Sequence, residues 1–199
     1  MRSSSADHGT LSIKIPAASS AGVFVFREIH EDELRPELFS SFIRRQIVHD
    51  CWRRSGSSLE IRPDPFIDDW TCDDILELLH KLRKIISAGG LVYGAFSSGC
   101  LKGFSAVDSR LFGSSSQYAD LAELHVSEEA RRLGVGSALF CKAAAFALGV
   151  GARKLYISSH SAVESVAFYL AMGCREAEEL EPMHVAKEPY DRQLEYVLK

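Results

Sequence analysis

The sequence of 199 residues lacks the patterns that mark several common protein classes. Its five cysteines are scattered and form no Cys-x-x-Cys pair, which argues against a metal site or a disulfide framework and favours free thiols in a reducing compartment. No apolar run approaches the roughly 20 residues that span a bilayer. The net charge is −4 and no basic block is present, so nothing points to nucleic acid. We therefore expect a cytoplasmic protein with neither a membrane nor a nucleic acid partner.

What is present is an ordinary globular composition, 46% hydrophobic and 25% charged, in a chain long enough for a single core. Residues 1–22 are rich in serine and alanine and show no hydrophobic periodicity, so we predict a disordered leader. Sparse charge and the acidic Asp7 argue against a transit peptide. We predict one domain over residues 23–199.

The first third of that domain gives the weakest pattern. Residues 23–26 predict a strand, and apolar residues at helical spacing from Leu34 to Val48 predict a helix from about residue 33 into the 40s or beyond. Residues 51–70 contain one glycine and two prolines and read as an irregular insertion with a short strand at 59–61.

Long loops in compact domains are usually functional or disordered, so we expect this insertion to help choose the substrate. Its side chains would suit a cationic, partly apolar amine; they are the acids Asp64, Asp68 and Asp69 and the aromatics Trp52, Phe66 and Trp70. The alternative is that Phe66 and Trp70 anchor the insertion to the core while the acids face water.

The middle of the chain is more regular. Thr71 followed by Asp74 resembles a helix N-cap with an acidic first turn, and the apolar stripe that follows ends at a pair of glycines, Gly89 and Gly90. Residues 91–96 and 101–108 predict a β-hairpin, and residues 154–159 predict a later strand.

The stretch 121–140 carries the clearest pattern. Alternating apolar residues at 121–126 predict a strand, and apolar residues at i, i+1, i+4, i+7, i+8 and i+11 from Leu139 predict a helix. The turn between them reads Arg131, Arg132, Leu133, Gly134, Val135 and Gly136. The first N–H groups of a helix have no internal partner and the helix dipole adds about half a positive charge there, so such a turn favours a phosphate. Its glycines remove side chains that would block the approach, and its arginines add charge.

Two better-known phosphate motifs do not fit this turn. A dinucleotide fingerprint needs a third glycine where Leu139 stands, and a P-loop needs a lysine where Ser137 stands. The segment resembles the pyrophosphate-binding signature of the GNAT superfamily of N-acetyltransferases. The predicted order β, α, α, β, β, β, α, β, α, β, β is also that of the GNAT fold, an α/β (α+β type) architecture with a central mixed, mostly antiparallel sheet flanked by helices.

The resemblance implies acetyl-coenzyme A (acetyl-CoA) as co-substrate, with its pyrophosphate on the turn and its pantetheine arm along the preceding strand, and no metal. The cofactor-binding residues it implies are Leu124, His125, Val126, Arg131, Arg132, Leu133, Gly134, Val135, Gly136, Ser137 and Phe168.

A second segment completes the resemblance. Ser161 and Glu164 form a capping box that predicts a helix start. Phe168-Tyr169, followed by Met172-Gly173-Cys174, resembles the family segment whose tyrosine lies near the cofactor sulfur and returns a proton to the departing thiolate. A phenol with a pKa near 10 stays protonated at neutral pH and can donate that proton. We predict Tyr169 as the acid; a purely structural tyrosine is the alternative.

The amine substrate must lose a proton before it attacks, and the central strand offers Asp120, Glu123 and His125. The period of two puts Glu123 and His125 on one face and Asp120 on the other. The resemblance places a catalytic Glu or His at the position of Asp120, and a bulge in this strand, common in the family, would change that parity. We predict Asp120 or Glu123 as the base, and His125 as a packed core residue.

We therefore expect an acetyl-CoA-dependent N-acetyltransferase that acetylates a primary amine of a small molecule or peptide by direct attack. The alternative is a non-catalytic acyl-CoA-binding regulatory module of the same fold. The acceptor and the oligomeric state, including a homodimer, stay open.

Overall fold

The computed structural model describes residues 11–12, 23–56 and 58–199. The predicted disordered leader lies outside these residues except for Leu11–Ser12, which form strand β1 and pair with β2. The other strands are β2 (Val25–Glu28), β3 (Gln46–Ser55), β4 (Ser58–Asp68), β5 (Leu91–Ser97), β6 (Cys100–Val107), β7 (Tyr118–Val126), β8 (Lys154–Ser159), β9 (Arg175–Glu176) and β10 (Arg192–Val197). The helices are α1 (Cys72–Ser87), α2 (Val135–Gly149), α3 (Val163–Ala171) and α4 (Pro182–Lys187).

The described strands form one large sheet and one separate hairpin. The large sheet runs in the order β1-β2-β5-β6-β7-β8-β10-β9, and β3 pairs only with β4. Every neighbouring pair in the described sheet is antiparallel except β7 and β8. The predicted mixed, mostly antiparallel sheet flanked by helices is therefore confirmed.

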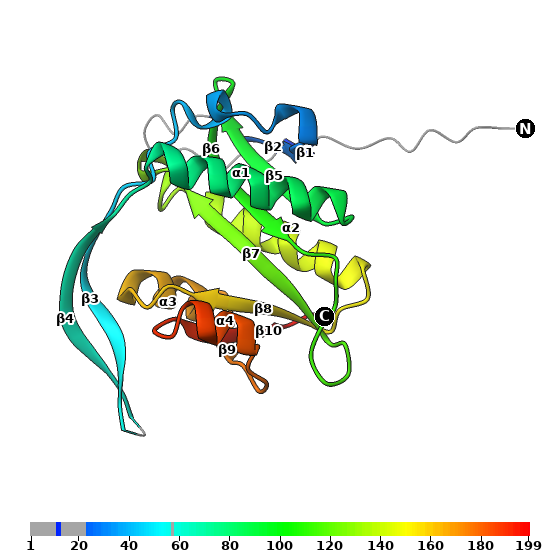
Figure 1. Ribbon diagram of the computed structural model, residues 1–199. Helices are drawn as coiled ribbons and strands as arrows, with labels where there is room; N and C mark the ends of the chain where they lie inside the picture. The colour runs from blue at the N-terminus through cyan, green and yellow to red at the C-terminus, as the bar shows by residue number, and fades with distance from the viewer. Residues whose placement is uncertain (1–10, 13–22, 57) are drawn as a thin grey trace, which may run out of the picture.

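The helices divide between the two faces of the sheet. Helix α1 packs its buried leucines against β5 and β6, while α2 packs on the opposite face against β5 to β8 (Figure 1). Helix α3 joins the α2 side, where Phe140 of α2 contacts Phe168 and Tyr169. The short helix α4 lies in front of β8, on the α1 side (Figure 1). None of the described helices is both long and apolar enough to cross a membrane.

The helix predicted from about residue 33 is wrong. Two short 3₁₀ turns, Glu31–Glu33 and Pro36–Phe39, occupy its first half, and Val48 already belongs to β3. Pro36 forces Arg35 into an extended conformation (φ −128°, ψ 158°), which ends any helix there. The apolar spacing reflected burial of single side chains such as Leu34, which is fully buried.

The irregular insertion predicted over 51–70 is also wrong, because β3 and β4 form a long hairpin. Its prolines are tolerated since β4 has no described partner on its outer edge, where a missing N–H costs nothing. Pro63 also lies opposite Asp50, beside a register shift in the hairpin.

The later elements match the predictions. Asp74 N–H donates to Thr71 Oγ1 (3.2 Å) and Thr71 N–H donates to the Asp74 carboxylate (2.7 Å), which starts α1. Ser98 and Gly99, with φ of 50° and 78°, make the tight turn of the β5–β6 hairpin.

Candidate active site

The candidate site begins where β7 and β8 separate. The two strands pair in parallel only from Tyr118 opposite Lys154 to Asp120 opposite Tyr156. Beyond Asp120 they diverge toward the β3–β4 hairpin (Figure 1). The edge of β7 that faces β8 therefore has no strand partner past Asp120 in the described chain, and the backbone N–H groups along it lack a strand carbonyl to bond.

The hydrogen-bond alternation of β7 shows which groups face this opening. Ser127 N–H donates to Lys102 O at 2.9 Å, toward β6. Alternate residues of an antiparallel pair point their N–H groups to opposite edges. The N–H groups of Leu124 and Val126 therefore point toward β8.

The turn before α2 exposes the start of that helix. Gly134 is the N-cap, exposed and left-handed (φ 82°), and no side chain caps the helix. The first bond into the helix is Ala138 N–H to Gly134 O, 3.1 Å. The amides of residues 135–137 therefore have no partner inside α2, which makes this end a fitting place for an anion.

Arg131 and Gly136 of the turn make structural contacts that the phosphate motif did not predict. Arg131 donates to two backbone carbonyls, Val126 O (3.1 Å) and Arg44 O (2.8 Å), and burial lowers the pKa of its guanidinium. It ties the turn to β7 and to the hairpin. A Cβ on Gly136 would lie 3.3 Å from the Phe168 ring and 3.5 Å from Val126, so this glycine makes room for α3. Arg132, exposed with φ 61°, keeps its charge toward solvent.

Helix α3 starts one residue later than the capping box predicted. Its N-cap is Ala162, which makes no side-chain cap, so the predicted Ser161 cap is wrong. Ser161 is buried, and its oxygens accept instead from the hairpin: Oγ from Arg53 (2.6 Å) and the carbonyl from Trp52 N–H (2.8 Å). The hydroxyl that would have capped the helix is used to hold β3.

Tyr169 packs beside Phe140 and Phe168 on the α2 side of the opening. Burial, with smaller contributions from the Cys174 thiol and the Glu123 carboxylate, holds its pKa well above the usual range. The phenol is therefore protonated at neutral pH and has a proton to donate.

A bulge in β7 decides the face of the acidic residues. Ala106 pairs with Glu123 but Val107 pairs with Leu121, so Ala122 is an extra residue. Leu121 and Leu124 pack in the core on the α2 side, whereas Ala122 packs in the core against α1. Parity changes at the bulge, and the prediction that Asp120 lies on the face opposite Glu123 is wrong: both contact residues on the α1 and α4 side.

Glu123 is held in two ion pairs. Lys81 of α1 donates to its Oε1 (2.7 Å) and to the freed carbonyl of Ala122 (2.9 Å), while His125 Nε2 lies 2.6 Å from its Oε2. These partners outweigh the cost of burial and lower the pKa of Glu123 to about 2. His125 also packs between Trp70 and Phe104, in agreement with a core role.

Asp120 is paired with a residue that the sequence reading missed. His184 of α4 places Nε2 3.2 Å from Asp120 Oδ2, and its ring stacks on Tyr156. Asp120 raises the pKa of His184 above its ordinary 6.5. The sequence feature that could have located His184 is Pro182 after Glu181. A proline in this position is typical of a helix start and would have placed His184 in the first helical turn.

Comparison with known proteins shows the family of the chain. The sequence model of the Acetyltransferase (GNAT) family matches residues 46–174, more than half of the chain. The chain belongs to the GNAT family of acetyltransferases. A search of curated protein sequences gives no match.

Solved structures agree on the GNAT fold. Nourseothricin acetyltransferase superposes with a TM-score of 0.66 at 16% identity, over 88% of this chain and 99% of that one. A Bacillus anthracis str. Ames protein assigned as a streptothricin acetyltransferase, solved with acetyl coenzyme A, gives 0.62 at 16% identity over 88% and 97%. The PaiA N-acetyltransferase of Thermoplasma acidophilum, solved with coenzyme A, gives 0.54 at 16% identity over 87% and 98%.

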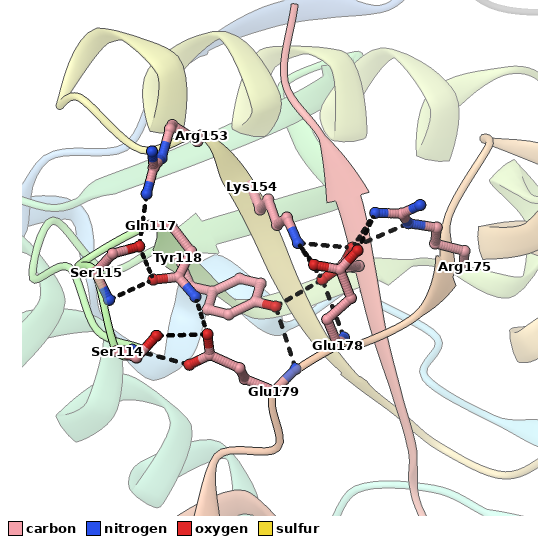
Figure 2. Close-up of polar contacts among 10 residues, drawn as sticks. Ser114, Ser115, Gln117, Tyr118, Arg153, Lys154, Arg175, Glu178 and Glu179 are labelled. Atoms are coloured by element: carbon pink, nitrogen blue, oxygen red, sulfur yellow. Dashed lines mark hydrogen bonds and ion pairs between the residues drawn. The ribbon is translucent and has the colours of Figure 1, made fainter.

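The closed end of the opening in this GNAT domain is fixed by a buried carboxylate. Glu195 of β10 is fully buried and accepts from Tyr118 Oη (2.6 Å), Lys154 Nζ (3.0 Å) and Arg175 Nε (2.9 Å). Figure 2 shows the Tyr118 phenol, Lys154 and Arg175 converging on this point. Tyr118 and Lys154 are the first paired positions of β7 and β8, so the carboxylate holds the two strands together at the closed end, and Arg175 adds β9 to the same contact.

The open end of the GNAT domain is bridged by the hairpin. Near β7, Ile43 N–H donates to Ser127 Oγ (2.8 Å) and Glu128 N–H to Ile43 O (2.8 Å). Near β8, β3 bonds to Ser161 as described above, and Cys51 bridges to Ala162. The segment from Ile43 through β3 is thus bonded to both sides of the opening, by Ile43 at the base of the hairpin on the β7 side and by β3 on the β8 side.

The acids of the hairpin do not form a cation site. Asp64 pairs with Arg53 and Asp68 pairs with Arg44, both within the hairpin or at its base. Phe66 packs against buried Val48 and Cys51, and Trp70 packs on the α1 core. The anchoring interpretation is therefore confirmed for Phe66 and Trp70, whereas Asp64 and Asp68 are paired with arginines and only Asp69 is exposed as that interpretation expected.

Proposed function

We propose that this chain is an acetyl-CoA-dependent N-acetyltransferase that transfers the acetyl group to a primary amine by direct attack. One observation carries the proposal. The gap between β7 and β8 has backbone donors on its edge, an uncapped helix N-terminus on one face of the sheet and two carboxylate pairs on the other. Donor and acceptor can therefore meet through the sheet from opposite faces.

The α2 face fits acetyl-CoA. The free amides of residues 135–137 would bind the pyrophosphate, with Arg132 adding charge at the surface. The N–H groups of Leu124 and Val126 would hold the pantetheine arm and polarise the thioester carbonyl. Arg131 supports both by fixing the turn to β7.

The α1 face fits the amine and its base. Glu123, with a pKa of about 2, stays ionised and is a weak base, so its role is to hold Lys81 and His125 in place beside the strand gap. The Asp120–His184 pair is better matched: its imidazole changes protonation above pH 6.5 and lies where the strands part. We assign proton removal to this pair.

The reaction needs one further group. The neutral nitrogen attacks the thioester carbon, the C–S bond breaks, and the thiolate takes a proton from the Tyr169 phenol. The proton that the nitrogen loses as the amide bond forms would pass to the solvent or to the phenolate, which restores the phenol. Positioning of the two substrates supplies most of the acceleration. An acyl-cysteine intermediate is disfavoured. Cys174 packs in the same hydrophobic cluster as Tyr169, and burial raises the pKa of its thiol to about 12.

Titration of the purified chain with acetyl-CoA by calorimetry, followed by a panel of amines with thiol release as readout, tests the proposal. Binding together with acetylation of at least one amine, identified by mass spectrometry, is the expected result. Binding without acetylation of any amine would favour the non-catalytic acyl-CoA-binding module. Absence of binding would contradict both.

A further inference from the structure

A groove of about 350 Å³ runs along the α1 face from the bulge in β7. This volume is at the small end of ligand sites, which span about 300–1,000 Å³. The side chains that matter for its chemistry are Lys81, Lys84, Ile85, Asp108, Arg110 and Asp120. Because Asp120 forms one end, the groove opens directly beside the pair to which we assign proton removal.

Some charged side chains of the groove already have partners and others do not. Lys81 is bound to Glu123, and Asp120 is bound to His184. Asp108 accepts the backbone N–H of Arg110 (2.9 Å). Within the described chain, the side chains of Lys84 and Arg110 form no ion pair or hydrogen bond, and both are exposed. Lys84 and Arg110 are thus the two cations of the groove without a partner in the described chain, while of its two acids Asp120 is paired with His184 and Asp108 accepts only a backbone N–H.

The positions of these cations suit a short ligand. Lys84 follows Lys81 by three residues, about 4.5 Å along the helix axis, and so lies nearly one turn from the bulge. Ile85, buried between them and the sheet, supplies an apolar wall. One oxygen of Asp120, Oδ1, is buried without a hydrogen-bond partner in the described chain. An amino group at this end and an anionic group one turn away would match the arrangement.

We propose that the acceptor is a small amine that carries a carboxylate, with the carboxylate on Lys84 and Arg110 and the amino group beside Asp120. The proposal rests on the proposed function and narrows its substrate class. A multiply charged cationic amine would instead meet two unneutralised cations here, and two of the three hairpin acids that could have attracted it, Asp64 and Asp68, are already paired.

The test compares α-amino acids with their carboxamides, which share the side chain and lack the negative charge. We expect the free acids to be acetylated, and the double variant Lys84→Ala/Arg110→Ala to raise their KM about 10- to 100-fold, the usual worth of hydrogen bonds to charged groups. Turnover of the carboxamides should not change. The comparison between variants cancels the different amine pKa of acid and amide.

Two controls make the result decisive. Lys199→Ala removes an exposed cation that does not line the groove and should leave both substrates unaffected. Lys84→Glu should reverse the preference toward the carboxamide. Equal loss of acid and amide in the double variant, or no change in either, would overturn the proposal.

A second experiment separates failure of the groove proposal from failure of the proposed function. Calorimetry of an amino acid and its amide against the protein saturated with coenzyme A measures the groove without any turnover. Tighter binding of the acid, lost in the double variant, supports the groove even if no amine is acetylated. Equal binding of the two would reject the groove even in an active enzyme.

Discussion

His184 Nε2 lies 3.2 Å from Asp120 Oδ2 and joins α4 to the point where β7 and β8 separate. This contact connects a helix near the end of the chain with the central strand, and it makes the assignment of the base testable by pH.

The first prediction concerns that pair. Asp120 raises the pKa of His184 above 6.5, so kcat/KM should rise with pH and level off above that value. Asp120→Asn removes the charge that stabilises the imidazolium, so the rise should move to lower pH and the plateau should fall. Initial rates from pH 5 to 9 measure both. A profile that keeps its midpoint in Asp120→Asn would contradict the assignment.

Glu123 should affect stability more than the pH profile. Its pKa falls from 4.5 to about 2 on folding, so it stabilises the fold above pH 4.5 and loses that contribution as pH falls toward 2. Thermal unfolding of Glu123→Gln should therefore show a lower Tm at neutral pH and a weaker acid dependence. Glu77→Gln, an exposed acid of α1, is the control and should behave as wild type.

Tyr169→Phe should separate chemistry from binding. The ring packing against Phe140 and Phe168 is kept and only the O–H is lost, so Tm and acetyl-CoA affinity should hardly change. If the phenol protonates the thiolate, kcat should fall ~10²–10⁴-fold. Full turnover in this variant would leave Tyr169 a packing residue.

The effect of replacing Gly134 should depend on whether the new residue tolerates a left-handed backbone. A left-handed φ of 82° costs a residue with a Cβ roughly 1–2 kcal/mol, less for asparagine. Gly134→Asn should thus fold normally, whereas Gly134→Val should lower Tm and weaken acetyl-CoA binding in calorimetry. Equal affinity in a folded Gly134→Val protein would remove the pyrophosphate from this turn.

Glu195→Gln should loosen the closed end of the opening. The amide cannot satisfy Tyr118, Lys154 and Arg175 together, so we expect a loss of about 1–3 kcal/mol in the free energy of unfolding. Urea titration measures it. Glu178 is more than half exposed, so Glu178→Gln should lower the free energy of unfolding by under about 1 kcal/mol. A similar loss in both variants would contradict the role of Glu195 in holding the closed end together.

Much of the fold could be predicted from local patterns. Helix α1 has a capping box and a one-sided stripe, and the β5–β6 hairpin has its turn residues in sequence, so local chemistry decided both. Residues 46–68 could not be assigned this way, since two strands that pair only with each other carry prolines and no clean alternation. These residues are strands because they pair with each other, and that pairing cannot be read from the local composition.

The site shows the same division. The turn around Gly134 and the placement of Tyr169 followed from contiguous motifs. The face of Asp120 did not, because a single extra residue, Ala122, reverses the alternation and its effect is visible only in the register with β6. His184 and Lys81 reach the site from distant elements, and no local pattern joins them to β7.

The hairpin has a consequence for the order in which ligands bind. Ile43, at its base, is bonded to Ser127 and Glu128 at the end of β7, and β3 is bonded to Ser161 beyond β8. Under the proposed function, a substrate that changes the separation of β7 and β8 would also change the energy of these bonds. The affinities of the two substrates would then be linked through this segment, with a linkage of the same magnitude whichever substrate is added first.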